Sequence, residues 1–173
     1  MLERSIPLLG EKTIELLENS HIAVFGLGGV GGFVVESLAR QGVGTFSIID
    51  FDIIQDSNKN RQIYALDSTL GKLKTDVAKE RILDINSKVK VYPYPIKIDS
   101  ETIASIPFEE FDYVIDCVDD VNAKLEIISL AKKYSKPILS CCGTANKMDS
   151  TKFQIKDISK TTVCPLAKKL RIE

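Results

Sequence analysis

Short apolar runs alternate along this chain with stretches in which apolar side chains recur at helical spacing. The apolar runs predict buried strands over residues 21–26, 45–50, 89–92, 112–117 and 137–141. The stretches of helical spacing predict helices over residues 29–41, 71–85 and 120–134, with a short helical turn begun by Asp99 and Ser100. This alternation predicts an α/β fold of the Rossmann-like, doubly wound type. Its mostly parallel sheet has helices on both faces and a ligand site at the carboxyl ends of the strands.

Length and charge narrow the class of protein. A chain of 173 residues, 44% of them hydrophobic, fits one compact domain. The 23 Lys and Arg residues balance 24 Asp and Glu residues to a net charge of −1, which excludes a strongly basic global field. The longest uncharged apolar run, residues 22–35, contains five glycines and is shorter than the roughly 20 apolar residues of a membrane span. We therefore expect a cytoplasmic protein without a membrane partner.

The four cysteines form no C-x-x-C pair, so the sequence predicts neither a zinc knuckle nor a thioredoxin-like redox motif. We expect reduced thiols that are buried or half-buried. Residues 147–173 carry seven Lys or Arg residues against three acids. Such a basic segment is typical of a surface that faces RNA, and also of an ordinary solvated surface.

The letters G-L-G-G-V-G stand between a predicted strand and a predicted helix. Glycines in this position allow a tight turn and bring phosphates close to the free N–H groups of a helix N-terminus. Asp50 lies nineteen residues after this loop, at the end of the second strand, where an acidic side chain accepts hydrogen bonds from ribose hydroxyls. These features predict an adenine nucleotide, of which NAD is the commonest. The glycines that we assign to nucleotide binding are Gly26, Gly28, Gly29 and Gly31.

A second set of polar residues favours ATP over NAD. Asn58, Asn60 and Arg61 lie in the loop after the second strand, Lys74 opens the next helix, and Asp119 ends the fourth strand. The sheet would bring them to the strand ends that carry the glycine loop. A guanidinium and an ammonium there could offset the charge that builds on phosphorus, and a carboxylate could hold Mg²⁺. Hydride transfer needs no such set.

Five short motifs together resemble the ThiF/MoeB/HesA family of adenylating enzymes, which is related to ubiquitin activation. They are G-L-G-G-V-G at residues 26–31, D-F-D at 50–52, S-N-K-N-R-Q at 57–62, G-K-L-K at 71–74 and D-C-V-D at 116–119. The resemblance implies that Asp50 binds ribose and that Asp119 works with Mg²⁺. It also implies that Arg61 and Lys74 contact the phosphates of ATP, so that Arg61, Lys74 and Asp119 are catalytic. Besides the glycines, the implied nucleotide-binding residues are Asp50, Asp52, Asn58, Arg61, Lys74 and Asp119.

The tail resembles the branch of this family that dehydrates threonylcarbamoyladenosine in tRNA. It reads N-K-M-D-S-T-K-F-Q-I-K-D-I-S-K-T over residues 146–161 and P-L-A-K over residues 165–168. The resemblance implies that ATP adenylates the carboxylate of this modified adenosine, which lies next to the anticodon. A neighbouring nitrogen of the same substrate then attacks, AMP leaves, and the product is cyclic. Because the substrate supplies both reacting groups, the cysteines need not be catalytic.

The same resemblance implies a homodimer and, in some members, a monovalent cation (K⁺ or Na⁺). It also allows a sulfur-transfer protein or a cysteine desulfurase as a partner. Arg4 corresponds to an N-terminal arginine that joins the nucleotide site of the partner subunit. The family chain normally continues further, so we expect residues 1–173 to be a single ThiF-type nucleotide-binding domain without the family's C-terminal segment. Cys164 stands where the family usually has a polar or acidic residue, and nothing in the sequence explains it.

Two other functions remain open at this point. An enzyme of the same fold could adenylate the C-terminal glycine of a ubiquitin-like sulfur carrier. ATP–pyrophosphate exchange that depends on such a carrier would favour this alternative. A Rossmann-type regulator that binds NAD without catalysis is the alternative from a different class, and NAD binding without ATP binding would indicate it.

Overall fold

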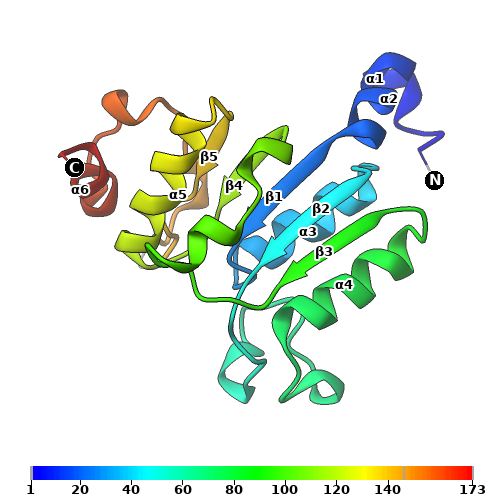
Figure 1. Cartoon of the computed structure of the whole chain (residues 1–173), viewed down its shortest axis with the longest axis horizontal. Coiled ribbons are helices and arrows are strands. Elements are labelled where there is room, and N and C mark those ends of the chain that lie inside the picture. The colour runs from blue at the N-terminus through cyan, green and yellow to red at the C-terminus, as the bar shows by residue number, and fades with distance from the viewer. Residues whose placement is uncertain (1, 146, 173) are drawn as a thin grey trace.

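A computed structural model describes residues 2–145 and 147–172. Its centre is a five-stranded sheet of parallel strands in the order β3-β2-β1-β4-β5 (Figure 1). The chain builds outward from β1 through β2 to β3, then crosses to the other side of β1 for β4 and β5. This reversal confirms the Rossmann-like, doubly wound fold, in which ligands generally bind at the carboxyl ends of the strands where the order reverses, here β1 and β4. The strands are β1 (His21–Phe25), β2 (Thr45–Ile49), β3 (Lys90–Tyr94), β4 (Tyr113–Asp116) and β5 (Ile138–Ser140).

Helices cover both faces of the sheet because β1 sends alternate side chains to opposite sides. Val24 packs in the core cluster formed with α3 (Gly31–Arg40) and α4 (Lys74–Ile85). Phe25 packs in the second cluster, formed with α5 (Val121–Lys133). None of the described helices is long and apolar enough to cross a membrane. The remaining helices are α1 (Ile6–Leu9), α2 (Glu11–Asn19) and α6 (Pro165–Ile172), of which α1 and α2 precede the predicted elements.

Two predicted boundaries are wrong for local reasons. The third strand continues past residue 92 to Tyr94 and includes Pro93. Proline lacks the N–H that a central strand needs, but β3 is an edge strand of this sheet and tolerates it. The next helix begins at Lys74 instead of residue 71, because Gly71 has a φ of 79°, in the left-handed region.

The connection from β3 to β4 contains two 3₁₀ turns, Thr102–Ser105 and Phe108–Glu110. They stand where the sequence predicts a short helical turn between two strands. The N-cap of the first turn is Glu101, not Asp99 or Ser100 as predicted, although Asp99 Oδ1 accepts a hydrogen bond from the Thr102 N–H at 2.9 Å. The second turn buries the ring of Phe108, which stacks on Phe25 with 5.6 Å between ring centroids. These turns therefore supply core contacts on the face of the sheet that α5 also covers.

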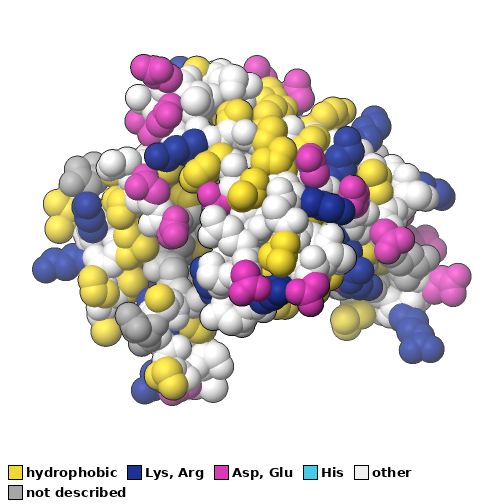
Figure 2. All heavy atoms as spheres, turned by 90° about the horizontal axis from the view of Figure 1, so that it is seen from below, with side chains coloured by type: hydrophobic (Ala, Val, Ile, Leu, Met, Phe, Trp, Pro, Cys, Tyr) yellow, Lys and Arg dark blue, Asp and Glu magenta, His cyan; other side chains and the backbone are white. Residues whose placement is uncertain are grey.

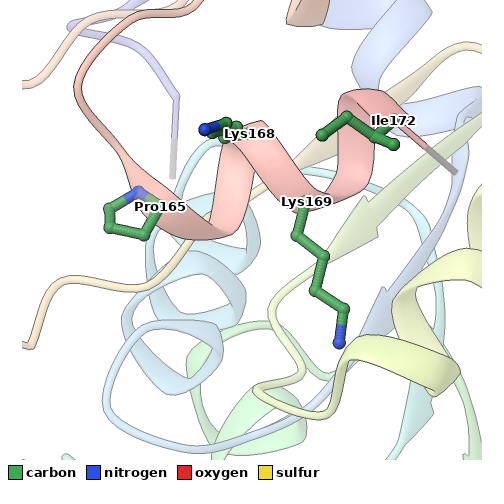
Figure 3. A pocket seen from close by; sticks show the side chains of 4 residues that line it. All are labelled: Pro165, Lys168, Lys169 and Ile172. Atoms are coloured by element: carbon green, nitrogen blue, oxygen red, sulfur yellow. The ribbon is translucent and has the colours of Figure 1, made fainter.

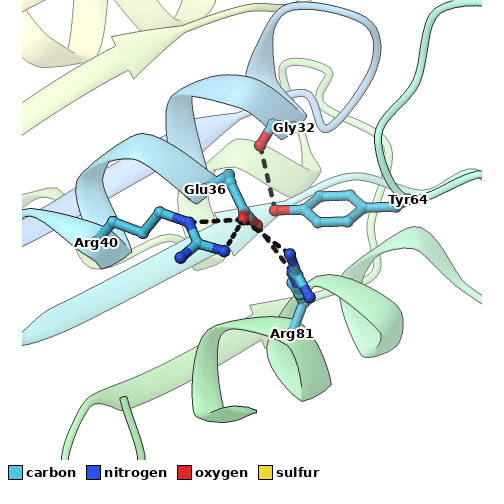
Figure 4. Close-up of polar contacts among 5 residues, drawn as sticks. All are labelled: Gly32, Glu36, Arg40, Tyr64 and Arg81. Atoms are coloured by element: carbon cyan, nitrogen blue, oxygen red, sulfur yellow. Dashed lines mark hydrogen bonds and ion pairs between the residues drawn. The ribbon is translucent and has the colours of Figure 1, made fainter. Parts of the chain in front are cut away.

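A cluster of charged side chains ties α3 to α4 (Figure 4). Glu36 Oε1 accepts hydrogen bonds from Arg40 on its own helix and from Arg81 Nη2 on α4, the latter at 2.9 Å. Its Oε2 accepts a second bond from Arg81 Nε at 3.0 Å. The buried Tyr64 hydroxyl donates to the Gly32 carbonyl at 3.3 Å. These bonds fix the helix that follows the glycine loop against the helix that begins with Lys74.

We expect Glu36→Gln to lower the free energy of unfolding at pH 7 by about 1–3 kcal/mol, because the change removes the charge from bonds to two arginines. The hydrogen bond from Arg81 lowers the pKa of Glu36 in the folded chain. The stabilisation is therefore present above the usual glutamate pKa of about 4.3 and is lost as the pH falls through the lowered value. Urea unfolding at pH 7 and at pH 3 measures both effects. The exposed Glu80→Gln is the control, and an equal loss at both pH values would contradict the expectation.

Candidate nucleotide-binding site

The loop from β1 into α3 is built by glycines that meet other backbone atoms. Gly26 has a φ of 84°, and a Cβ there would lie 2.9 Å from the carbonyl carbon of Cys117. A Cβ on Gly31 would lie 1.8 Å from the carbonyl oxygen of Gly26, so the loop closes on itself. At Gly28 the nearest atom would be 3.9 Å away, which leaves space over the backbone. An open backbone at a helix N-terminus is the geometry that admits a phosphate.

Asp50 joins the loop after β2 to the glycine loop. Its Oδ2 accepts a hydrogen bond from the Leu27 N–H at 2.7 Å, and its Oδ1 accepts one from the Asp52 N–H at 2.8 Å. The side chain is buried, and this burial raises the pKa of Asp50 although both N–H groups favour the carboxylate. Each carboxylate oxygen keeps a further lone pair, so Asp50 can still accept a ribose hydroxyl.

Lys74 lies between two aspartates at the first position of α4. Its Nζ donates to Asp52 Oδ2 at 2.6 Å and lies 3.8 Å from Asp50 Oδ2. The lysine side chain is 5% exposed, whereas that of Asp52 is 48% exposed. A buried ammonium needs such partners. A phosphate could therefore replace the exposed carboxylate of Asp52 as the acceptor of Lys74.

Arg61 lies beside the glycine loop, as predicted. A Cβ on Gly29 would be 3.4 Å from Arg61 Cγ, and the exposed guanidinium donates to the Ser57 carbonyl and to Asn60 Oδ1. Asn58 is buried beneath this loop, where its Oδ1 accepts a hydrogen bond from the Gln55 N–H at 3.0 Å. The structure thus shows Asn58 shaping the loop that carries Arg61.

Asp119 lies in the loop between β4 and α5. The prediction that it ends the fourth strand is wrong, because β4 ends at the buried Asp116 and Asp119 follows as an exposed residue. In the part of the chain that the structure describes, no group of three or more His, Cys, Asp or Glu side chains could hold a metal ion. Mg²⁺ commonly binds one or two carboxylates together with substrate phosphates, so Asp119 fits that role as a single carboxylate.

Arg4 is not brought to the other predicted site residues. It lies in a turn before α1. The nearby Leu2 packs against Gly42, because a Cβ added to Gly42 would lie 2.4 Å from Leu2 Cδ1. Gly42 follows the C-terminal end of α3, whereas the glycine loop precedes its N-terminal end. Within one chain, the N-terminal segment that carries Arg4 and the glycine loop therefore lie at opposite ends of α3, and Figure 1 shows the N-terminus far from the start of α3.

Two features of the site were not assigned from the sequence. Gln62 is buried with its amide nitrogen 3.9 Å from the position of a Cβ on Gly28, and its only signal was its place in the S-N-K-N-R-Q motif. Asp116 forms a fully buried ion pair with Lys124 of α5. Asp116 belongs to the D-C-V-D motif, but nothing in the sequence indicates Lys124. The four cysteines are half-buried and form no disulfide, as predicted.

A parallel sheet whose glycine loop is flanked by Asp50, Lys74 and Arg61 defines a nucleotide-binding α/β protein. The chain belongs to the ThiF family, which it matches over residues 2–170. It is 43% identical to the tRNA threonylcarbamoyladenosine dehydratase of Bacillus subtilis over 163 residues, which are 94% of this chain and 64% of that protein. The chain thus spans less than two thirds of the length of this relative.

Solved structures agree with this family. The chain superposes on E. coli tRNA N6-threonylcarbamoyladenosine dehydratase, TcdA, in complex with ATP, with a TM-score of 0.94 and 36% identity. The match covers 98% of this chain and 70% of that one. A further relative is the adenylyltransferase and sulfurtransferase UBA4 of Vanderwaltozyma polyspora, at 34% identity over 76% of this chain and 30% of that protein.

We expect Gly31→Ala to lower the free energy of unfolding by about 2–4 kcal/mol, because the new methyl group would overlap the Gly26 carbonyl. Gly28→Ala adds the same methyl group into open space and should change stability by less than about 1 kcal/mol. Guanidinium chloride unfolding of both variants measures the difference. Equal stabilities would show that the loop does not close on Gly31 as described.

Proposed function

We propose that this chain carries out the ATP-dependent dehydration of threonylcarbamoyladenosine in tRNA, through adenylation of the substrate carboxylate. The observation that carries the proposal is the arrangement of Arg61, Lys74 and Asp50 around one glycine loop. Two cations beside an open helix N-terminus suit a triphosphate, and the buried carboxylate suits a ribose. The ATP complex of the superposed relative supports this assignment.

Each side chain has a defined part in the proposed reaction. Asp50 would bind the ribose, while Arg61 and Lys74 would offset the charge that develops at the α-phosphorus. Lys74 reaches the phosphates by exchanging Asp52 for a phosphate oxygen. Asp119 would hold Mg²⁺, which neutralises phosphate charge when it is bound. The monovalent cation that the family implies has no residue assigned to it.

The substrate supplies both reacting groups. One oxygen of its carboxylate attacks the α-phosphorus, the bond to the β-phosphate oxygen breaks, and pyrophosphate leaves. A nitrogen of the same substrate then attacks the activated carbonyl carbon and loses its proton, and AMP leaves with the former carboxylate oxygen. The cyclic product has therefore lost one water. The protein contributes position and charge, so none of its four cysteines is needed as a nucleophile.

A tRNA partner is supported by the basic C-terminal segment. Lys168 and Lys169 border a hollow of about 260 Å³ along α6, together with Pro165 and Ile172 (Figure 3). Exposed lysines on such a surface can contact the phosphate backbone without reading the sequence. A cytoplasmic location is also part of the proposal, and the proposed tRNA substrate is the reason for it. Asn146, the first residue of the tail motif, lies outside the described residues.

A homodimer is also part of the proposal. Apolar side chains form a band across the face seen from below in Figure 2, between charged side chains. The loop between β2 and α4 lies on that side of the molecule (Figure 1) and exposes Phe51, Ile53, Leu66 and Leu70 by 39–55%. A second copy could cover such a surface. The proposed part of Arg4 in the partner's site needs a separate contact between the copies, because Arg4 lies at the other end of α3 from this surface. Residues 1–173 would act as one ThiF-type nucleotide-binding domain.

The similarity to UBA4 favours one second candidate. The same site could adenylate the C-terminal glycine of a ubiquitin-like sulfur carrier, since that reaction also activates a carboxylate on ATP. A sulfur-transfer protein or a cysteine desulfurase would then be a partner. ATP–pyrophosphate exchange that requires the carrier and not the modified tRNA would replace the dehydratase proposal. Calorimetric titration with Mg-ATP and with NAD tests both candidates together, because binding of NAD alone would exclude adenylation.

We expect Arg61→Ala to lower AMP formation on tRNA carrying threonylcarbamoyladenosine by about 10²–10³-fold, because it removes a cation next to the reacting phosphates. Lys59→Ala is the matched control. Lys59 lies in the same loop but is already paired with Asp56 and Asp67, so its loss should leave the rate unchanged. AMP release from labelled ATP is the measurement. A full rate in the Arg61 variant would refute its proposed part.

A further inference from the structure

A buried ion pair lies directly below the candidate site, and the proposed reaction does not use it. Asp116 is the last residue of β4, and its Oδ2 lies 2.9 Å from the Nζ of Lys124, with both side chains fully buried. Lys124 also donates to the Cys141 carbonyl at 2.8 Å, and the Ser140 hydroxyl donates to Asp116 Oδ2 at 2.6 Å. The pair therefore joins β4, α5 and the end of β5.

Stability alone does not account for such a pair. Taking two charges out of water costs several kcal/mol per ion, and well-packed apolar side chains of similar volume often replace a buried pair without loss. Apolar side chains cannot accept or donate the directional hydrogen bonds that a charged pair makes. Asp116 Oδ1 accepts a hydrogen bond from the Val118 N–H at 3.0 Å, so the carboxylate also turns the backbone of the loop that follows.

This loop touches the glycine loop through its backbone. The carbonyl group of Cys117 and the nitrogen of Val118 lie 2.9–3.0 Å from the position of a Cβ on Gly26. Asp119 follows at once, and Asp120 then begins α5 by accepting a hydrogen bond from the Ala123 N–H at 2.8 Å. Asp119 therefore lies between Asp116 and Asp120, whose side chains both accept hydrogen bonds from backbone N–H groups.

We propose that Asp116 and Lys124 are positioning residues, which hold the peptide between Cys117 and Val118 against the glycine loop and so place Asp119 for a metal-bound phosphate. This inference rests on the proposed function, because the role of Asp119 belongs to it. The ion pair acts through Asp119 and touches no substrate. Its effect is to set the Mg²⁺ concentration at which ATP binds.

The test uses the double variant Asp116→Leu with Lys124→Met, which removes both charges and leaves no unpaired ion in the core. Calorimetry with ATP at increasing Mg²⁺ measures the Mg²⁺ concentration for half-maximal binding. We expect it to rise by about 10-fold or more, the range found when groups that orient metal ligands are removed. The affinity for AMP without metal should change by less than about twofold, because Asp50 is untouched.

Amide hydrogen exchange gives a readout without any ligand. The Val118 amide should exchange faster in the double variant, while the Leu27 amide, which bonds to Asp50, should keep its rate. Ser140→Ala is a milder variant should the double variant not fold. It removes one bond to Asp116 and should raise the Mg²⁺ requirement in the same direction by a smaller factor.

Controls separate this inference from the proposed function. The double variant Glu36→Gln with Arg81→Met removes an ion pair between α3 and α4 and should leave the Mg²⁺ requirement unchanged. Asp119→Asn should raise it. A rise with Asp119→Asn but neither with the Asp116 and Lys124 double variant nor with Ser140→Ala would overturn the positioning role alone. No rise with Asp119→Asn would overturn the proposed part of Asp119 and this inference with it. No ATP binding by the unsubstituted chain would overturn the proposed function as well.

Discussion

The direct contact between two backbone segments determines the geometry of this protein's site. The turn from β1 into α3 leaves no room for a side chain at Gly26, where the peptide after β4 fills the space, or at Gly31, where the Gly26 carbonyl fills it. The Gly32 N–H at the start of α3 donates to the Gly28 carbonyl at 3.1 Å and so joins the loop to the first turn of the helix. The position of every other site residue is defined relative to this contact.

The charges around the loop are arranged so that a ligand can exchange with the protein's own groups. The Lys74 side chain is buried, and its Nζ lies 2.6 Å from Asp52 Oδ2 and 3.8 Å from Asp50 Oδ2. Asp50 is fixed by two backbone N–H groups, whereas Asp52 is half-exposed and makes one bond to the lysine. An incoming phosphate can displace Asp52 at little cost, because the released carboxylate returns to water. Binding a polyanion thus requires no rearrangement of the core.

The sequence predicted the fold well because strands buried on both faces are continuous apolar runs. It also predicted the loops that come together at their carboxyl ends, since parallel strands place these loops on one edge. It did not predict the partner of Asp116, because a lysine in an amphipathic helix is usually solvated. Lys124 is buried only because β5 and its loop close over it. The sequence also placed Asp119 at the end of the strand, because the hydrogen bond from the Val118 N–H to Asp116 Oδ1, which accompanies the end of β4, has no signal in the sequence.

The two candidate reactions share every residue described around the glycine loop, so this loop cannot decide between them. Both transfer the adenylyl group to a carboxylate, and they differ in what carries that carboxylate and in what attacks it afterwards. Selection must therefore come from surfaces that hold the rest of the substrate. The segment after β5 is one such surface. It exposes the apolar side chains of Phe153, Ile155 and Ile158 between basic residues. In a nucleic-acid complex, the exposed Phe153 ring could stack on a base and the neighbouring lysines could pair with phosphates. Under the proposed function, this segment would hold the tRNA, and its chemistry is separate from the nucleotide site that both candidate reactions share.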